Sequence, residues 1–288
     1  MKKWETTTRM TVNENIKPAV WGEFSLLRQI PTVLRARGFR LYTQDGRRLR
    51  LIDLWLNGGA AVLGHTPPNI LRELKNTASR GLYAPFPHFT EGRFLKALSK
   101  LFPERSFRLY AAPTPELAAL YKTGAAGLWR PFTNPISPFE INEDDDRPAF
   151  LIPVLPGIQH WKDNLPLGLC VIAAKCESNL CELPIGDTLS PVLLAVAARG
   201  VYDLLASPHR AKPVFSRINK ALQKSSWRQQ GIYLYPKERP GNDAWAALFN
   251  QFLEAGFLLP PNQNQPLILP GELSDGEEAK LAACLARH

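Results

Sequence analysis

Apolar residues recur at helical spacing in several segments of the chain. In residues 67–81 the apolar side chains lie three or four positions apart and share one face of a predicted helix. We expect Asn69 to cap this helix and Gly81 to end it. The same spacing, with proline, threonine, serine or acidic residues at the start, predicts further helices beginning near residues 91, 115, 191, 243 and 275.

Other apolar runs are short and bounded by turn residues, which is typical of strands. Two runs within residues 39–56 are joined by Asp45-Gly46, a pair that accepts the positive φ angles of a tight hairpin turn. Residues 149–155 and 167–174 are almost continuously apolar, as in strands that are covered on both faces. Strands that alternate with helices in this way predict an α/β fold.

The pattern breaks between residues 130 and 148, where nineteen residues hold four prolines and five acidic residues. We interpret this stretch as an exposed, irregular connection. Its acidic cluster, residues 143–146, lacks the glycine and distal glutamate of a calcium loop, so a solvated surface is expected there. The predicted domains are an arm over 1–19, a large domain over 20–228 and a small C-terminal α/β subdomain over 229–288.

Composition predicts a folded protein in the cytoplasm. The chain has 288 residues, of which 45% are hydrophobic and 21% charged, enough to bury a substantial core. Its first residues show no secretory pattern, and no run reaches the roughly 18 apolar residues of a membrane helix. We therefore expect no membrane insertion, and we expect the four cysteines to be reduced.

Positive charge gathers in one early segment. The formal net charge is +9, and six arginines fall between Arg35 and Arg50. They could bind nucleic acid or anionic lipid through phosphate groups. Alternatively, they are the outward side chains of a hairpin, and no zinc-finger, RNP or helix-turn-helix pattern accompanies them.

Spacing of histidines and cysteines predicts no metal site. The five histidines show no pair at ligand spacing, and four residues separate Cys176 from Cys181 where a zinc or redox pair needs two. The sequence also lacks the glycine motifs of serine hydrolases, P-loop NTPases and dinucleotide-binding enzymes.

Residues 38–69, "GFRLYTQDGRRLRLIDLWLNGGAAVLGHTPPN", resemble the N-terminal signature of class III aminotransferases. These are fold-type-I pyridoxal-phosphate (PLP) enzymes, and glutamate-1-semialdehyde aminomutase is one of them. The matching positions are Asp45, Gly46, Asp53, Gly58, Gly59, Gly64, His65 and Pro68. Residues 185–205 and 248–261 resemble later family segments more weakly. The resemblance implies a reduced fold-type-I large domain with a small C-terminal subdomain, a homodimer, and a substrate-entrance loop formed by Asn57, Gly58, Gly59, Gly64 and His65.

The same resemblance implies where PLP would bind. Thr114 and Thr188 would contact the cofactor, and Lys162 would form the Schiff base. PLP chemistry also needs a cup of backbone N–H groups at a helix start for the phosphate. The matching segment "AAPTPELAAL" has no glycine, and Pro113 and Pro115 each remove a donor. The glycines that follow the family's lysine are absent after Lys162, and we find no acidic partner for the pyridine nitrogen.

Three hypotheses follow. In the first, the chain is a pseudoenzyme that needs no cofactor and binds a small anionic ligand or a protein partner. In the second, it is an active PLP-dependent aminotransferase or aminomutase that uses Lys162. In the third, it is a basic scaffold that binds nucleic acid or anionic lipid through Arg35 to Arg50.

Overall fold

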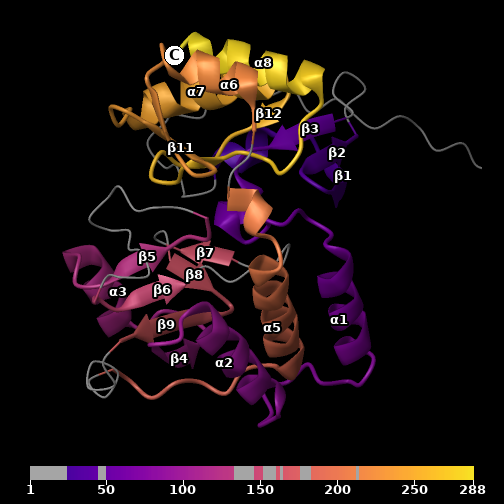
Figure 1. Cartoon of the computed structure of the whole chain (residues 1–288), viewed down its shortest axis with the longest axis vertical. Helices are drawn as coiled ribbons and strands as arrows, with labels where there is room; N and C mark the ends of the chain where they lie inside the picture. The colour runs from indigo at the N-terminus through magenta and orange to yellow at the C-terminus, as the bar shows by residue number, and fades with distance from the viewer. Residues whose placement is uncertain are drawn as a thin grey trace, which may run out of the picture.

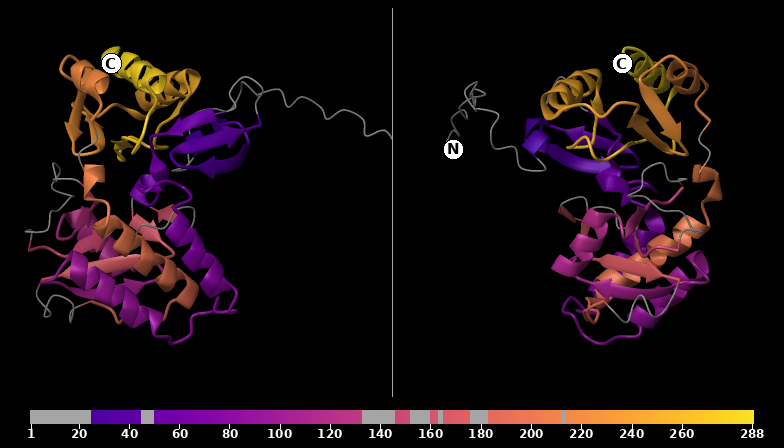
Figure 2. Two further views of the ribbon diagram at one scale, coloured as in Figure 1. Left: turned by 45° about the vertical axis from the view of Figure 1, so that its right-hand side comes forward. Right: turned by 90° about the vertical axis from the view of Figure 1, so that its left-hand side faces the viewer.

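The computed structural model describes residues 25–44, 50–132, 146–151, 160–162, 165–175, 183–211 and 214–288. These residues form two lobes, which lie one above the other in Figure 1 and are seen from two further sides in Figure 2. We call the lower one the large lobe. The upper one, which holds the first strands and the last helices, is the terminal lobe.

The large lobe is built on a four-stranded sheet of order β4-β9-β6-β5. Its strands are β4 (Ser106–Tyr110), β9 (Cys170–Ala174), β6 (Ala149–Leu151) and β5 (Gly127–Trp129). Strand β9 runs antiparallel to both of its neighbours, whereas β5 and β6 are parallel. Every residue of β5, β6 and β9 is buried, as the continuous apolar run at 167–174 predicts.

Four helices complete the large lobe. They are α1 (Pro68–Ala78), α2 (Thr90–Leu101), α3 (Pro115–Thr123) and α5 (Pro191–Leu205). Both α1 and α2 pack against α5, which is buried along most of its length (Figure 1). A separate pair of strands, β7 (His160–Lys162) and β8 (Leu165–Leu167), forms a small antiparallel sheet.

The first predicted helix begins one residue earlier than its expected cap. Pro67 occupies the N-cap position without a side-chain hydrogen bond, and Pro68 begins α1, since its fixed φ suits the first helical residue. Asn69 therefore lies inside the helix. Its Nδ2 donates to Oδ1 of Asp203 at 3.2 Å, so it links α1 to α5 and does not cap.

The terminal lobe combines both ends of the described chain. Its mixed sheet has the order β1-β2-β3-β12. These strands are β1 (Val33–Arg37), β2 (Arg40–Thr43), β3 (Arg50–Asp53) and β12 (Phe257–Leu258). Pairing of β2 with β3 confirms the predicted hairpin, while its Asp45-Gly46 turn lies outside the described residues. The sequence predicts a boundary between two domains at residues 228 and 229. Because β12 pairs in parallel with β3, this sheet contains strands from both sides of that boundary.

A second sheet and three helices complete the terminal lobe. The sheet has the order β10-β11-β13, with β10 (Trp227–Gln230), β11 (Tyr233–Pro236) and β13 (Leu267–Ile268). The helices are α6 (Ser216–Leu222), α7 (Asn242–Ala255) and α8 (Asp275–Ala286). The helix predicted to begin near residue 275 is confirmed as α8. It starts with a capping box, in which Ser274 and Glu277 each accept a hydrogen bond from the other's backbone N–H. The prediction of an α/β fold is likewise confirmed.

Candidate functional site

One buried carboxylate fixes the loop that connects the two lobes after β3. Asp53 is 2% exposed, and its Oδ1 accepts hydrogen bonds from the N–H groups of Trp55 (2.8 Å) and Leu56 (2.9 Å). Its Oδ2 lies 2.9 Å from Nε2 of His65, near the far end of the loop. Asp53 therefore holds both ends of the loop. It supplies the hydrogen-bond acceptor that the N–H groups of Trp55 and Leu56 need inside the protein.

The backbone of this loop explains its glycines. The φ angle is 66° at Gly58, 107° at Gly59 and 94° at Gly64, a range that side chains disfavour. A Cβ at Gly64 would also lie 3.2 Å from the carbonyl oxygen of Gly38. The structure thus places the five predicted entrance residues on one compact loop: Asn57, Gly58, Gly59, Gly64 and His65. Their role as a substrate entrance stays a prediction.

The first turn of α3 has backbone donors that the protein itself occupies. Thr114 is the N-cap, and its Oγ1 accepts from the N–H of Leu117 at 3.4 Å. Pro115 follows and has no N–H to offer. The exposed Glu116 carboxyl accepts hydrogen bonds from the Thr114 hydroxyl and from the backbone N–H of Glu116 itself. Both bonds lower the pKa of this carboxyl. A carboxylate therefore already interacts with the positive end of this helix.

Thr188, the second predicted cofactor contact, is exposed in the segment that leads to α5. Next to it, Asp187 accepts a hydrogen bond from the N–H of Ala111 through Oδ2 at 2.8 Å. The backbone N–H of Asp187 donates to the carbonyl oxygen of Leu109, also at 2.8 Å. These bonds bring the Thr188 segment beside the chain that runs from β4 to Thr114.

Lys162, the predicted Schiff-base residue, ends strand β7. It pairs with Leu165 of β8 in an antiparallel register. Its side chain lies outside the part of the chain that the structure describes, so its catalytic role stays a prediction.

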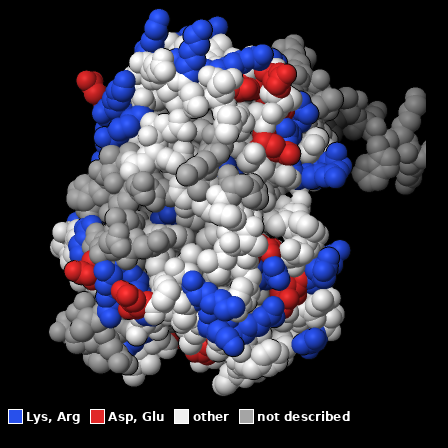
Figure 3. Space-filling view, in the orientation of Figure 1, with Lys and Arg blue, Asp and Glu red and all other residues white. Residues whose placement is uncertain are grey.

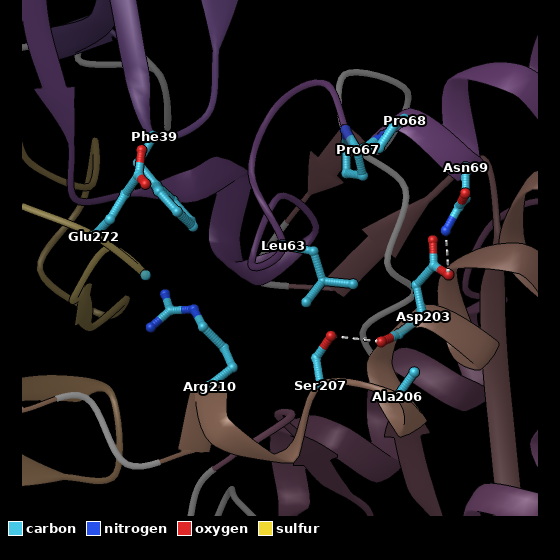
Figure 4. Close-up of a pocket in the computed structure, with 11 residues that line it drawn as sticks. Phe39, Leu63, Pro67, Pro68, Asn69, Asp203, Ala206, Ser207, Arg210 and Glu272 are labelled. Carbon is cyan, nitrogen blue, oxygen red and sulfur yellow. Dashed lines mark hydrogen bonds between the residues drawn. The ribbon is translucent and has the colours of Figure 1, made fainter.

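A cavity of about 410 Å³ lies where the two lobes meet (Figure 4). Its walls come from four places: the turn between β1 and β2, the loop and start of α1, the end of α5 with the turn that follows it, and the segment between β13 and α8. Eleven residues line it: Phe39, Leu63, Pro67, Pro68, Asn69, Asp203, Ala206, Ser207, Arg210, Gly271 and Glu272. The sequence does not predict this site, because the signature residues that line it, such as Pro68, meet Arg210 and Glu272 only through the fold.

The early arginines that the structure describes are largely engaged within the protein. Arg40 donates to Glu277 through Nε (3.1 Å) and Nη2 (2.7 Å), and Arg50 lies 3.1 Å from the same carboxylate. Arg35 stacks over the ring of Tyr42 at 4.3 Å. On the face in Figure 3, lysines and arginines lie on both lobes with acidic residues among them. Arg47 and Arg48 lie outside the described residues.

Among the described residues, no three histidines, cysteines or acids are grouped so that they could hold a metal ion. Cys176, Cys181 and most of the acidic cluster at 143–146 lie outside them. No helix in the described ranges is long and apolar enough to span a membrane.

Two bacterial proteins resemble this chain along most of its length, and no family model matches it. One is an uncharacterized protein of Treponema pallidum (strain Nichols), 28% identical over 297 residues, covering 85% of this chain and 91% of that protein. The other is an uncharacterized protein of Borreliella burgdorferi, 28% identical over 261 residues, covering 88% and 90% respectively.

Solved structures identify the fold. Ornithine aminotransferase of Plasmodium yoelii superposes with a TM-score of 0.63 at 12% identity, covering 89% of this chain and 92% of that one. N-acetylornithine aminotransferase of Stenotrophomonas maltophilia gives 0.61 at 15% identity, covering 90% and 96%. The chain has a fold-type-I, class III aminotransferase-like fold. The resemblance predicted from residues 38–69 is thereby confirmed at the level of the fold.

The aminotransferase-like fold raises the question of whether PLP fits this chain. At the start of α3, where the resemblance predicts the phosphate cup, the structure has a proline, an N–H group that the side chain of Thr114 caps, and the carboxylate of Glu116. A phosphate there would compete with Thr114 for the N–H of Leu117 and would be repelled by Glu116. The first turn of α3 therefore does not fit a phosphate group.

Proposed function

We propose that this aminotransferase-like chain does not carry out PLP chemistry and binds a small anionic metabolite instead. The first turn of α3 carries this proposal, because Thr114, Pro115 and Glu116 leave it without the free donors that a phosphate needs. A fold by itself does not grant an activity, since activity depends on the residues of a site.

The main alternative is an active PLP enzyme that uses Lys162. It is favoured by the position of Lys162 three residues before Leu165-Pro166, where the resemblance puts a Schiff-base lysine. The scaffold hypothesis ranks below it, because Arg40 and Arg50 already form ion pairs with Glu277.

Reduction with borohydride after incubation with PLP separates the first two functions. We expect the absorption spectrum of free PLP, and an intact mass without one stoichiometric adduct at a unique lysine. Lys162→Ala and the exposed Lys122→Ala should behave like the unchanged protein. A visible band that reduction removes, with one PLP mass fixed at Lys162 and lost only in Lys162→Ala, would contradict the proposal and favour the PLP enzyme.

We further propose that the chain is a cytoplasmic homodimer. The link between α1 and α2 exposes Tyr83 (65%), Phe86 (53%) and Phe89 (68%), and aromatic groups exposed together are typical of surfaces that bind a partner. The same surface could instead bind another protein. A monomer mass in light scattering at micromolar concentration would contradict the homodimer.

A further inference from the structure

Arg210 is a buried arginine at the boundary of the two lobes. It lies in the turn Pro208–Ala211 after α5 and is 5% exposed. Its Nε donates to the carbonyl oxygen of Val62 at 3.1 Å, and Nη2 donates to the carbonyl oxygen of Leu269. Its guanidinium lies 5.2 Å from the centre of the Phe39 ring. These contacts hold the side chain in one orientation on the cavity wall (Figure 4).

The remaining nitrogen of this guanidinium, Nη1, has no hydrogen-bond partner in the part of the chain that the structure describes. Burial lowers the pKa of Arg210 to about 10, so the group is still a cation at neutral pH. A buried charged donor without an acceptor is costly, which favours a ligand that supplies one. No described carboxylate forms an ion pair with Arg210.

The acidic side chains of the cavity limit the charge of such a ligand. Asp203 binds Arg199 and Asn69 through Oδ1, and Glu272 lies 3.0 Å from Nη1 of Arg40. Asp203 and Glu272 are thus paired with Arg199 and Arg40, which do not line the cavity. The two carboxylates still place negative charge on the cavity wall. A phosphate dianion would meet stronger repulsion from them than a singly charged group would. A carboxylate has the acceptor oxygens and the single charge that suit Arg210.

Apolar groups on the same wall indicate the rest of the ligand. Phe39, Leu63 and Pro67 line the cavity beside the polar groups. The cavity volume, about 410 Å³, lies within the range of pockets that hold small organic molecules. A short aliphatic chain would therefore contact these residues while its carboxylate reaches Arg210.

We propose that this cavity binds a small monocarboxylate with an apolar chain, and that the carboxylate accepts a hydrogen bond from Nη1 of Arg210. The inference rests on the proposed function for the claim that the chain binds a small anion, and it names the site and the chemical class. The site is distinct from the first turn of α3, where the resemblance puts the cofactor phosphate.

Titration calorimetry with three probes tests this site: 4-methylpentanoate, its neutral analogue 4-methylpentanamide, and inorganic phosphate. We expect the carboxylate to bind at least about tenfold more tightly than either of the others, because a charge-assisted hydrogen bond is stronger than a neutral one. Arg210→Met should weaken that binding at least about tenfold, whereas Arg228→Met, which removes an exposed arginine, should leave it unchanged.

A second variant covers the case in which Arg210→Met does not fold. Ala206 is an exposed cavity residue, so Ala206→Phe should block the cavity without touching the hydrogen bonds of Arg210. Loss of 4-methylpentanoate binding in this folded variant would support the site. Equal binding of the acid and the amide, undiminished binding in Ala206→Phe, or no binding at millimolar concentration would each overturn the inference, and Arg210 would then only join the lobes.

These outcomes are separate from those of the proposed function. A PLP adduct at Lys162 would refute the pseudoenzyme even if 4-methylpentanoate bound at Arg210. Failure of the carboxylate to bind, with no PLP adduct, would remove the site at Arg210 and leave the loss of PLP chemistry standing.

Discussion

Replacement of Asp53 by alanine is expected to destabilise the protein by about 4 kcal/mol, the largest effect that we predict for one polar side chain. The variant leaves the N–H groups of Trp55 and Leu56 without their acceptor and removes the contact with His65. The loop that they fix carries strained backbone, since Leu56 and Asn57 have φ angles of 47° and 51°. Urea denaturation followed by circular dichroism measures the change.

Asp53→Asn is the matched control for this prediction. Its amide oxygen can still accept from both backbone N–H groups, so we expect it to retain about half of the lost stability. A change of less than about 1 kcal/mol in Asp53→Ala would show that the loop does not depend on this carboxylate.

Replacement of Glu277 by alanine should cost about 3 kcal/mol, because it leaves a half-buried arginine without its main partner. Glu277 binds Arg40 through both oxygens, accepts from the N–H of Ser274 at 2.8 Å and lies near Arg50. The control is Glu272→Ala, which removes a 70% exposed carboxylate from the same Arg40 and should cost about 0.5 kcal/mol. Equal effects of the two variants in urea denaturation would contradict this assignment.

The same contact predicts how stability depends on pH. Hydrogen bonds from Arg40 are the main reason that the pKa of Glu277 falls from 4.5 to about 2. A carboxylate with a lowered pKa in the folded state stabilises the protein fully above its ordinary pKa. This stability should therefore be lost progressively as the pH falls from about 4.5 to about 2, and Glu277→Ala should show a shallower loss over that window.

Local signals in the sequence predicted much of the fold. The threonine and proline at the start of α3, and the serine and glutamate at the start of α8, act within three residues of each other, so their spacing alone predicts both helix starts. The parallel pairing of β3 with β12 joins residues about two hundred positions apart, and no short-range pattern encodes it. That pairing is why the terminal lobe includes both ends of the described chain.

Some residues of the candidate sites could likewise be predicted from local sequence, and others could not. Signature residues such as Gly64 and His65 could be predicted. A positive φ angle favours glycine, and the Gly-His pair is visible in the sequence. Arg210 could not be found, because its proposed role rests on its burial and on a nitrogen without a partner among the described residues, and both arise only when the two lobes pack together. Asp53 belonged to the signature, but its bonds to the loop became visible only in the structure.

An aminotransferase-like fold whose first turn of α3 holds no phosphate, as we propose, is physically consistent. The stability of the lobes depends on buried side chains such as Trp245 and Phe252, and on loop contacts such as those of Asp53. None of these groups belongs to the first turn of α3. The loss of PLP chemistry that we propose would therefore need only residues such as Pro115 and Glu116 in this turn, and it would leave the surrounding contacts unchanged.

Equilibrium binding of PLP and of pyridoxal, which lacks the phosphate, shows whether the protein holds a phosphate group at the first turn of α3. Equilibrium dialysis in the Arg210→Met variant, or in Ala206→Phe, removes any contribution of the other anion site. If the first turn of α3 holds no phosphate, the two affinities should agree within about threefold, or less than about 1 kcal/mol. A preference for PLP of about a hundredfold or more, which corresponds to nearly 3 kcal/mol, would show that the protein holds the phosphate group of PLP, and the proposed loss of cofactor binding would be wrong.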